Sequence, residues 1–254
     1  MINSTYYWNM NDEANKLRRK WYIDEYVPID IFSIIKNKIP NLTMVFMDMG
    51  DKISGASSEF EGYTTIFLNS QQTYGRQRFS LAHEVYHLLI EEHSDKEEDK
   101  QVITCMNNSN EKIEKQADEF ASCLLLPHNA LKYYEEFNGI EKNEDWTIEK
   151  IIDTEQYFQI SHHALMWRLR NLNIISYEFY QKYKSSPVKK ARKMGYNTKL
   201  YESYTGKEET TDGMYIYLLN KLYDDDLISI EEKNRYLTDA FCDWINVNNN
   251  EIIR

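Results

Sequence analysis

Two histidines four residues apart, His83 and His87, stand in the stretch FSLAHEVYHLLIEEH, and Glu84 directly follows the first of them. On a helix, residues at i and i+4 share one face with Cβ atoms about 6 Å apart, so both imidazoles can reach one metal ion. A carboxylate next to the first histidine falls beside the ion, where it can take a proton from a bound water. The spacing predicts a zinc site with Glu84 as the catalytic residue; the alternative is an ordinary helix with partly buried histidines.

A catalytic zinc needs a third protein ligand and an open coordination position. The stretch EKIEKQADEFASCLLLP supplies candidates at the start of a second helix. Glu114 and Asp118 share one face there, so Glu114 can bind zinc while Asp118 accepts the Nδ1–H of a histidine in the second shell. Glu111, one turn earlier, is the rival ligand. The alternative for these acids is a solvated helix N-terminus, where carboxylates are favoured by the helix dipole.

Together the two motifs resemble the ImmA/IrrE family of metallopeptidases. RQRFSLAHEVYHLLI matches the arginine–phenylalanine lead into HExxH, and IEKQADEFASCLLLP matches the E-x-x-A-[ND]-x-F-A-x-x-L-L-x-P signature. The resemblance covers roughly residues 12–178. It implies a thermolysin-like HExxH gluzincin that binds Zn²⁺ through His83, His87 and Glu114, with Glu84 in the catalytic place. It also implies a specific protein substrate, typically a helix-turn-helix transcriptional repressor of a mobile element or stress response.

One position departs from the family pattern, a second carries its less common residue, and one histidine falls outside it. Tyr86 stands where the family usually has glycine, which places a bulky ring on the HExxH helix and leaves the ligand set intact. Asp118 stands where asparagine is commoner. His93 lies six residues after His87 on another helix face, so we expect a surface residue there and not a ligand.

The elements that must position these residues follow from the hydrophobic pattern. We expect an α+β fold, with a mostly helical zincin-like core and a small mixed β-sheet. The expected elements are helices over 11–26, 27–40, 76–92 and 111–127, a strand over 41–49, two short strands within 55–70, and a polar loop over 93–110. By analogy with zincins, TTIFLN (64–69) is a candidate edge strand that holds an extended substrate by strand addition.

We divide the chain into a metallopeptidase domain (1–130), a helix-turn-helix-like unit (131–185), a basic linker (186–210) and a C-terminal helical module (211–254). Thr147 and Ser161 are candidate helix caps in the second unit. His162 and His163, being adjacent, cannot share a metal from one helix face, so capping or surface roles are expected for them. The linker assignment rests on seven Lys or Arg and no acid between residues 179 and 199.

Composition narrows the function classes. The net charge is −11, which disfavours direct DNA binding because phosphate contact needs local positive charge. Three cysteines without CxxC, no apolar signal core and no membrane-length apolar run favour a cytoplasmic protein. The leading hypothesis is a zinc endopeptidase that cleaves a specific intracellular protein; the alternative is a catalytically silent zincin-fold regulatory protein that binds a partner. The sequence does not determine the oligomeric state.

Overall fold

The computed structural model describes residues 4–91, 102–104 and 111–242 of the chain. His93 and Cys105 lie outside these ranges. The helices are α1 (Ser4–Lys20), α2 (Ile31–Lys38), α3 (Tyr74–Leu89), α4 (Glu111–Leu125), α5 (His128–Phe137), α6 (Ile148–Phe158), α7 (His162–Asn171), α8 (Tyr177–Tyr183), α9 (Val188–Lys193), α10 (Met214–Asp224) and α11 (Ile230–Asp239), with short 3-10 helices η1 (Asn143–Asp145) and η2 (Lys199–Tyr201). The strands are β1 (Leu42–Met47), β2 (Gly55–Phe60), β3 (Tyr63–Asn69), β4 (Val102–Thr104) and β5 (Thr210–Gly213). The predicted α+β class is confirmed.

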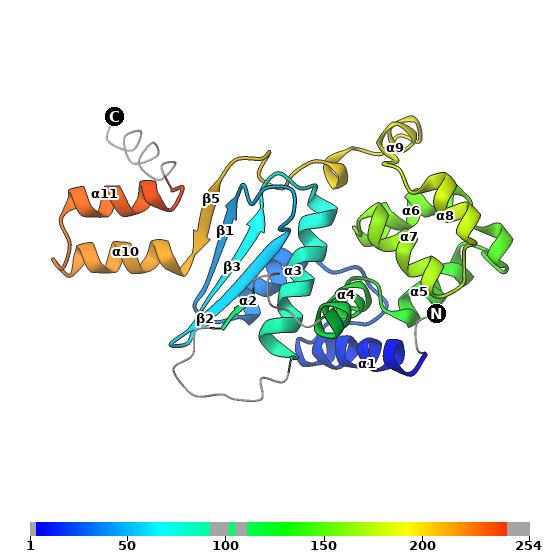
Figure 1. The fold of residues 1–254 in the computed structure, drawn as a ribbon, viewed down its shortest axis with the longest axis horizontal. Coiled ribbons are helices and arrows are strands. Elements are labelled where there is room, and N and C mark those ends of the chain that lie inside the picture. The colour runs from blue at the N-terminus through cyan, green and yellow to red at the C-terminus, as the bar shows by residue number, and fades with distance from the viewer. Residues whose placement is uncertain (1–3, 92–101, 105–110, 243–254) are drawn as a thin grey trace.

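One mixed sheet joins the five strands in the order β4-β2-β3-β1-β5 (Figure 1). β1 and β3 pair in parallel, and the other pairs are antiparallel. Two expectations are wrong here. The segment 64–69 belongs to β3, whose hydrogen bonds are used on both sides by β2 and β1, so it is not an edge strand. The expected loop over 93–110 contains β4, which pairs with Ser57–Glu59 of β2.

Helices α3 and α4 form the layer that carries the predicted site. α3 packs against β2 and β3 on one side and against α4 on the other, and α1 covers the far side of α4 (Figure 1). Along α3 the residues facing these neighbours, among them Leu81, Ala82 and Val85, are fully buried. The HExxH helix is therefore packed between the sheet and α4.

Arg78, in the family-like lead into HExxH, is a structural residue. Its side chain is buried and donates hydrogen bonds to the carbonyl oxygens of Ile29 and Gln159. Gln159 is the left-handed C-cap of α6, at the turn into α7. Gly75 completes this junction, since a Cβ there would lie 3.0 Å from the Cα of Ser161. The helix-turn-helix-like unit is thus fastened to the N-terminal half of α3.

The helices of that unit begin at the predicted caps: the Thr147 hydroxyl accepts from the N–H of Lys150, and the Ser161 hydroxyl from that of Ala164. The capping or surface role expected for His162 is wrong, because this imidazole is buried and bonds to Glu155 and the Tyr183 carbonyl. His163 is exposed, as expected. In α7, Met166, Leu169 and Arg168 are buried, so most of the helix is used for packing.

Residues 186–210 do more than link two units. They contain α9 and η2, and Tyr204 inserts its ring into a stack with Phe32 (centroids 4.6 Å apart) and Tyr74 (5.6 Å). This return path delivers β5 to the free edge of β1. The sheet of the metallopeptidase domain therefore takes its last strand, Thr210–Gly213, from the boundary between the basic linker and the C-terminal module.

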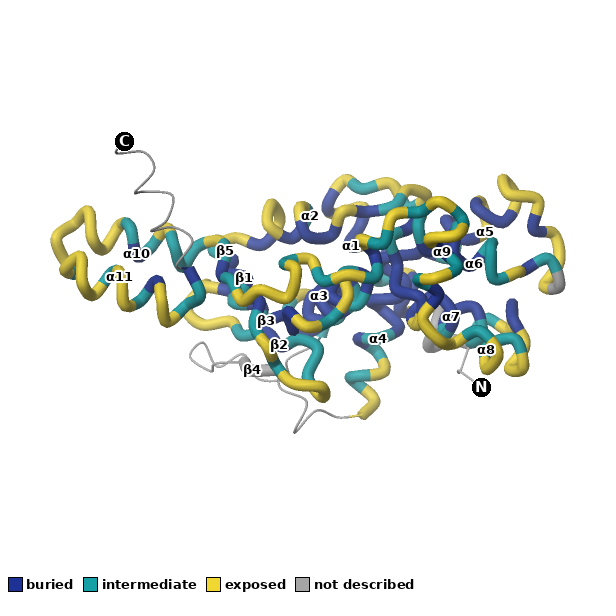
Figure 2. The backbone as a smooth tube through the Cα atoms, turned by 90° about the horizontal axis from the view of Figure 1, so that it is seen from above, coloured by how far each residue is buried: buried dark blue, intermediate teal, exposed yellow. Residues whose placement is uncertain are grey.

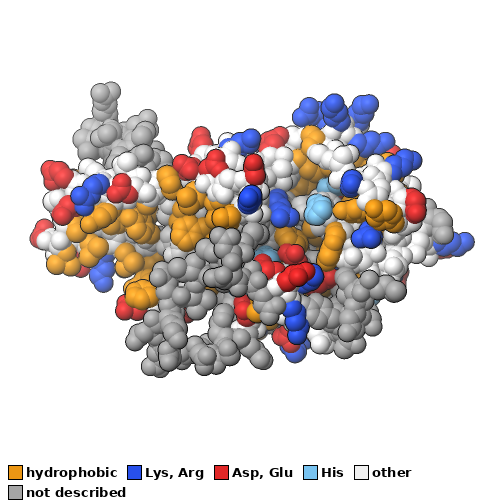
Figure 3. All heavy atoms as spheres, viewed as in Figure 1, with side chains coloured by type: hydrophobic (Ala, Val, Ile, Leu, Met, Phe, Trp, Pro, Cys, Tyr) orange, Lys and Arg blue, Asp and Glu red, His pale blue; other side chains and the backbone are white. Residues whose placement is uncertain are grey.

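After β5 the chain forms a helical arm, α10 and α11, that projects from the sheet (Figure 2). Its own small core contains Leu219, Leu237 and Cys242. Hydrophobic side chains also gather on the visible face of the arm (Figure 3). Across the described ranges, no helix combines the length and apolarity needed to cross a membrane.

Candidate metal centre

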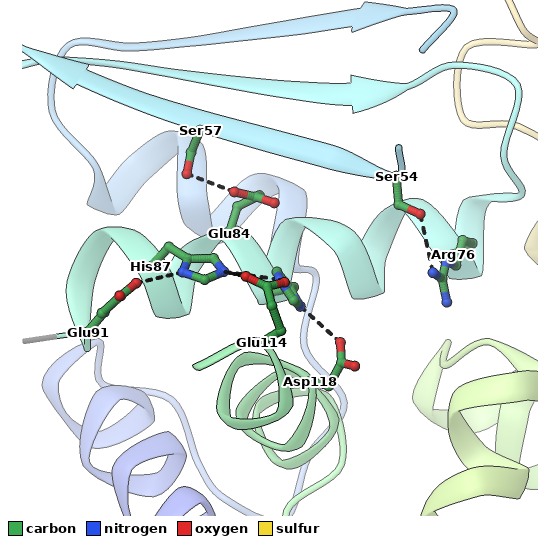
Figure 4. Close-up of polar contacts among 9 residues, drawn as sticks. Ser54, Ser57, Arg76, Glu84, His87, Glu91, Glu114 and Asp118 are labelled. Atoms are coloured by element: carbon green, nitrogen blue, oxygen red, sulfur yellow. Dashed lines mark hydrogen bonds and ion pairs between the residues drawn. The ribbon is translucent and has the colours of Figure 1, made fainter. Parts of the chain in front are cut away.

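His83, His87 and Glu114 bring three ligand atoms together between α3 and α4 (Figure 4). The two Nε2 atoms lie 3.1 Å apart, and the Glu114 carboxylate oxygens lie 3.2 Å from that of His83 and 3.6 Å from that of His87. Ligand atoms bound at 2.0–2.1 Å in a tetrahedral zinc site lie about 3.3 Å from one another. The spacing of this triad therefore fits a zinc ion.

A carboxylate fixes the other nitrogen of each imidazole. His83 Nδ1 lies 2.9 Å from Asp118 Oδ1, which is the contact predicted from the sequence. His87 Nδ1 lies 2.7 Å from Glu91 Oε2. When the proton sits on Nδ1 and the carboxylate accepts it, Nε2 is the nitrogen left to bind a metal. Asp118 and Glu91 therefore favour the tautomer that a metal ligand requires.

The same acids raise the pKa of His83. Burial opposes protonation of this imidazole, but hydrogen bonds to Asp118 and Glu114 outweigh burial and raise its pKa to about 9. Carboxylates that raise the pKa of a buried imidazole this far give the site a negative electrostatic potential. The charge of the site favours a divalent cation, which competes with the proton for the same nitrogen.

Glu84 points from α3 toward the sheet, on the side of the helix that faces β2 (Figure 4). Its side chain is buried, and its Oε2 accepts a hydrogen bond of 2.8 Å from the hydroxyl of Ser57. A Cβ on Gly55 would lie 3.3 Å from Glu84 Oε1, so the glycine at the start of β2 leaves room for this carboxylate. Glu84 lies beside the triad and is not one of its three members.

Tyr86, the departure from the family pattern, packs between the helices. Its ring lies against Phe120 of α4, with centroids 5.6 Å apart, and its hydroxyl donates to Gln116 Oε1 at 3.1 Å. The side chain is only 5% exposed. The bulky ring therefore forms part of the contact between α3 and α4. Glu114 and Asp118 lie on α4.

Four further residues lie near the triad or its helices, and one of them, Glu111, was considered from the sequence. Glu111, the rival ligand, is exposed and pairs with Lys115, outside the triad. Glu91 was missed, although its i+4 spacing from His87 puts it on the same helix face. Ser57 was missed because only the pairing of α3 with β2 brings it to Glu84. Arg76, two turns before His83, donates to the hydroxyl of Ser54 (Figure 4).

Comparison with known families places this geometry in context. The family model of the IrrE N-terminal-like domain, the M78 peptidases, matches residues 38–170, which is more than half of the chain. The chain belongs to this family. No curated protein matches it. The suspected ImmA/IrrE relationship is thereby confirmed.

The match runs from the C-terminal end of α2 to the end of α7, so it includes β1–β3, both helices of the triad and the helix-turn-helix-like pair. IrrE-like M78 proteins are metallopeptidases, and the family implies a metal, typically zinc. The His–His–Glu cluster of this IrrE-like chain supplies a donor set suited to that ion.

Proposed function

We propose that this IrrE-like protein is a zinc-dependent endopeptidase with His83, His87 and Glu114 as zinc ligands. The observation that carries the proposal is the convergence of the three ligand atoms, with both Nδ1 positions held by Asp118 and Glu91. Such hydrogen bonds orient ligating histidines and raise their basicity. A solvated helix N-terminus, the alternative explanation for the acids of α4, gives no reason for this convergence.

Glu84 is the general base and acid in this proposal. A zinc ion bound by the triad would supply Lewis-acid activation of water and of the scissile carbonyl. Glu84 accepts the proton of the attacking water at a carboxylate oxygen and returns it to the leaving amine. The Ser57 hydroxyl donates to Oε2 of this carboxylate and holds it in place.

We further propose that the substrate is a specific intracellular protein, with a helix-turn-helix transcriptional repressor as the first candidate, and that the enzyme acts in the cytoplasm. The family supports this choice, and two features of the helix-turn-helix-like unit support a protein partner over DNA. Arg168 is buried and donates to Ser122, and Arg170 stacks on the rings of Tyr177 and Tyr180. The arginines of α7 are thus used within the fold.

The test is to compare wild type with Glu84→Gln on candidate repressors, chosen from genes beside the one that encodes this chain. Both proteins should bind one zinc per chain, and only the wild type should cleave; the reason is that the amide keeps the shape of the side chain and cannot take the proton. If Glu84→Gln retains zinc and reproduces every effect of the wild type in vitro and in cells, the protein is a silent zincin-fold regulator and the endopeptidase proposal is wrong.

A further inference from the structure

A cavity outside the metal centre lies between α5, α6 and the segments that follow α1 and α9. Its volume is about 630 Å³, within the range of small-molecule pockets, about 300–1,000 Å³. None of the described residues that line it belongs to the triad. The proposed peptidase mechanism therefore gives this cavity no role.

The walls of the cavity are aromatic. Five tyrosines and two phenylalanines line it. Tyr26 and Tyr133 meet edge to face with centroids 5.9 Å apart, and Tyr134 and Tyr157 are 5.4 Å apart. The tyrosines come from four separate segments, and Tyr133 and Tyr157 are about half exposed. Packing holds the rings in place while part of their surface stays open to a ligand.

The charge on the described lining of the cavity is negative. Asp153 is the only charged side chain among the described residues that line it. The hydroxyl of Tyr196 donates to Asp153 Oδ1 at 2.6 Å, which fixes the direction of the carboxylate. That hydrogen bond raises the pKa of Tyr196 to about 12, so the phenol stays a neutral donor. The amides of Asn138 and Gln156 add two uncharged polar groups.

We propose that this cavity binds an organic cation, an alkylated ammonium or a guanidinium group, between the tyrosine rings and the Asp153 carboxylate. The faces of aromatic rings carry partial negative charge and attract a weakly hydrated cation, and Asp153 supplies the counter-charge. An anionic ligand such as a nucleotide finds no Lys or Arg among the described lining residues. We therefore expect the cavity to bind a cation more tightly than a neutral or anionic molecule of the same size.

The experiment titrates the full-length protein with choline, agmatine and 3,3-dimethylbutan-1-ol, a neutral molecule with the shape of choline, and follows binding by calorimetry and tyrosine fluorescence. At least one cation should bind saturably. For choline the preference over its neutral counterpart should be roughly tenfold, which corresponds to a cation–π contribution of about 1–2 kcal/mol. Absence of saturable binding by both cations, or equal affinity for choline and the alcohol, overturns the proposal.

Substitutions in the lining test whether the cation binds in this cavity. Asp153→Asn should reduce the preference for the cation, because only the rings then attract it, while Tyr196→Phe, which keeps the charge, retains the full preference. Tyr157→Ala should weaken binding of the cation at least fivefold. Tyr217→Ala removes a ring of similar exposure on the distant α10 and should change nothing. Circular dichroism and zinc content show that each variant is folded. A folded Asp153→Asn protein that keeps the full preference contradicts the role of the carboxylate.

Discussion

Two regions of this molecule hold a histidine against a carboxylate, and they differ in what the second ring nitrogen faces. At the metal centre, His83 Nδ1 meets Asp118, and Nε2 faces His87 and Glu114. In the helix-turn-helix-like unit, His162 Nδ1 lies 2.5 Å from Glu155, and Nε2 is 2.6 Å from the carbonyl oxygen of Tyr183. The first ring presents a nitrogen to other ligands, while the second uses both nitrogens within the fold.

The comparison shows how to separate a ligand from a structural histidine. Burial and a carboxylate partner are common to both, and in both the carboxylate overcomes burial and raises the pKa of the histidine. Convergence of Nε2 with further donors distinguishes His83. We therefore expect substitutions in the two regions to affect different quantities, zinc binding in one and stability in the other.

The largest effects should come from removing the histidines themselves. His83→Ala or His87→Ala should reduce bound zinc to background, since two protein ligands cannot hold the ion tightly. His162→Ala should keep one zinc per chain and lower the free energy of unfolding by about 3–5 kcal/mol, because the buried Glu155 loses its cationic partner and keeps the hydrogen bond from Tyr201. Metal analysis and chemical denaturation measure the two effects. Loss of zinc in a folded His162→Ala protein would contradict the structural role assigned to His162.

Smaller effects are expected from the carboxylates that orient the ligands. Asp118→Asn and Glu91→Gln should each weaken zinc binding by about 10–100-fold without abolishing it, since the carboxylates act through the imidazoles. Glu111→Gln is the matched control, because Glu111 is exposed and paired with Lys115. Competition with a chromophoric chelator gives the affinities. If Glu111→Gln loses zinc while Glu91→Gln does not, the ligand and the orienting residues are wrongly assigned.

The pH dependence of zinc binding follows from the raised pKa of His83. The proton competes with zinc wherever the metal-free imidazole is protonated, that is, below about pH 9. Zinc affinity should therefore rise with pH up to about 9, by as much as roughly tenfold per unit, and level off above it. An affinity that stays constant between pH 6 and 8 contradicts the role of His83 as a ligand.

The smallest effect is expected at Tyr86. Tyr86→Phe keeps the ring against Phe120 and removes the hydrogen bond to Gln116. The loss should lower the free energy of unfolding by about 0.5–1.5 kcal/mol and leave zinc affinity unchanged. Denaturant melts with and without zinc measure both quantities. A large drop in zinc affinity contradicts the packing role and places the ring in the metal pocket.

Local patterns predicted the parts of the structure that depend on local spacing. His83, His87 and Asp118 lie on helix faces set by the 3.6-residue repeat, and Thr147 and Ser161 cap the helices they precede. Glu91 obeys the same spacing rule and could have been found in the same way. The buried role of His162 depends on the turn that brings α7 back to Glu155, so the isolated HH pair gave no sign of it.

Long-range pairing accounts for most of what the sequence did not predict. β4 and β5 are three and four residues long, too short to show a period, and their strand conformation comes from the partners β2 and β1. The position of β3 inside the sheet depends on the parallel pairing with β1, which no local signal specifies. The same is true of Ser57, which reaches Glu84 only because α3 packs on β2.

The most direct test of the central claim is a crystal structure of the zinc-loaded protein with anomalous diffraction recorded at the zinc edge. The account predicts one ion at about 2.0–2.2 Å from His83 Nε2, His87 Nε2 and a carboxylate oxygen of Glu114, with Glu84 beside it and not bound to it. A zinc peak held by Glu111 or by residues outside α3 and α4 contradicts the account. So does the absence of a peak between His83 and His87 in protein shown to contain one zinc per chain.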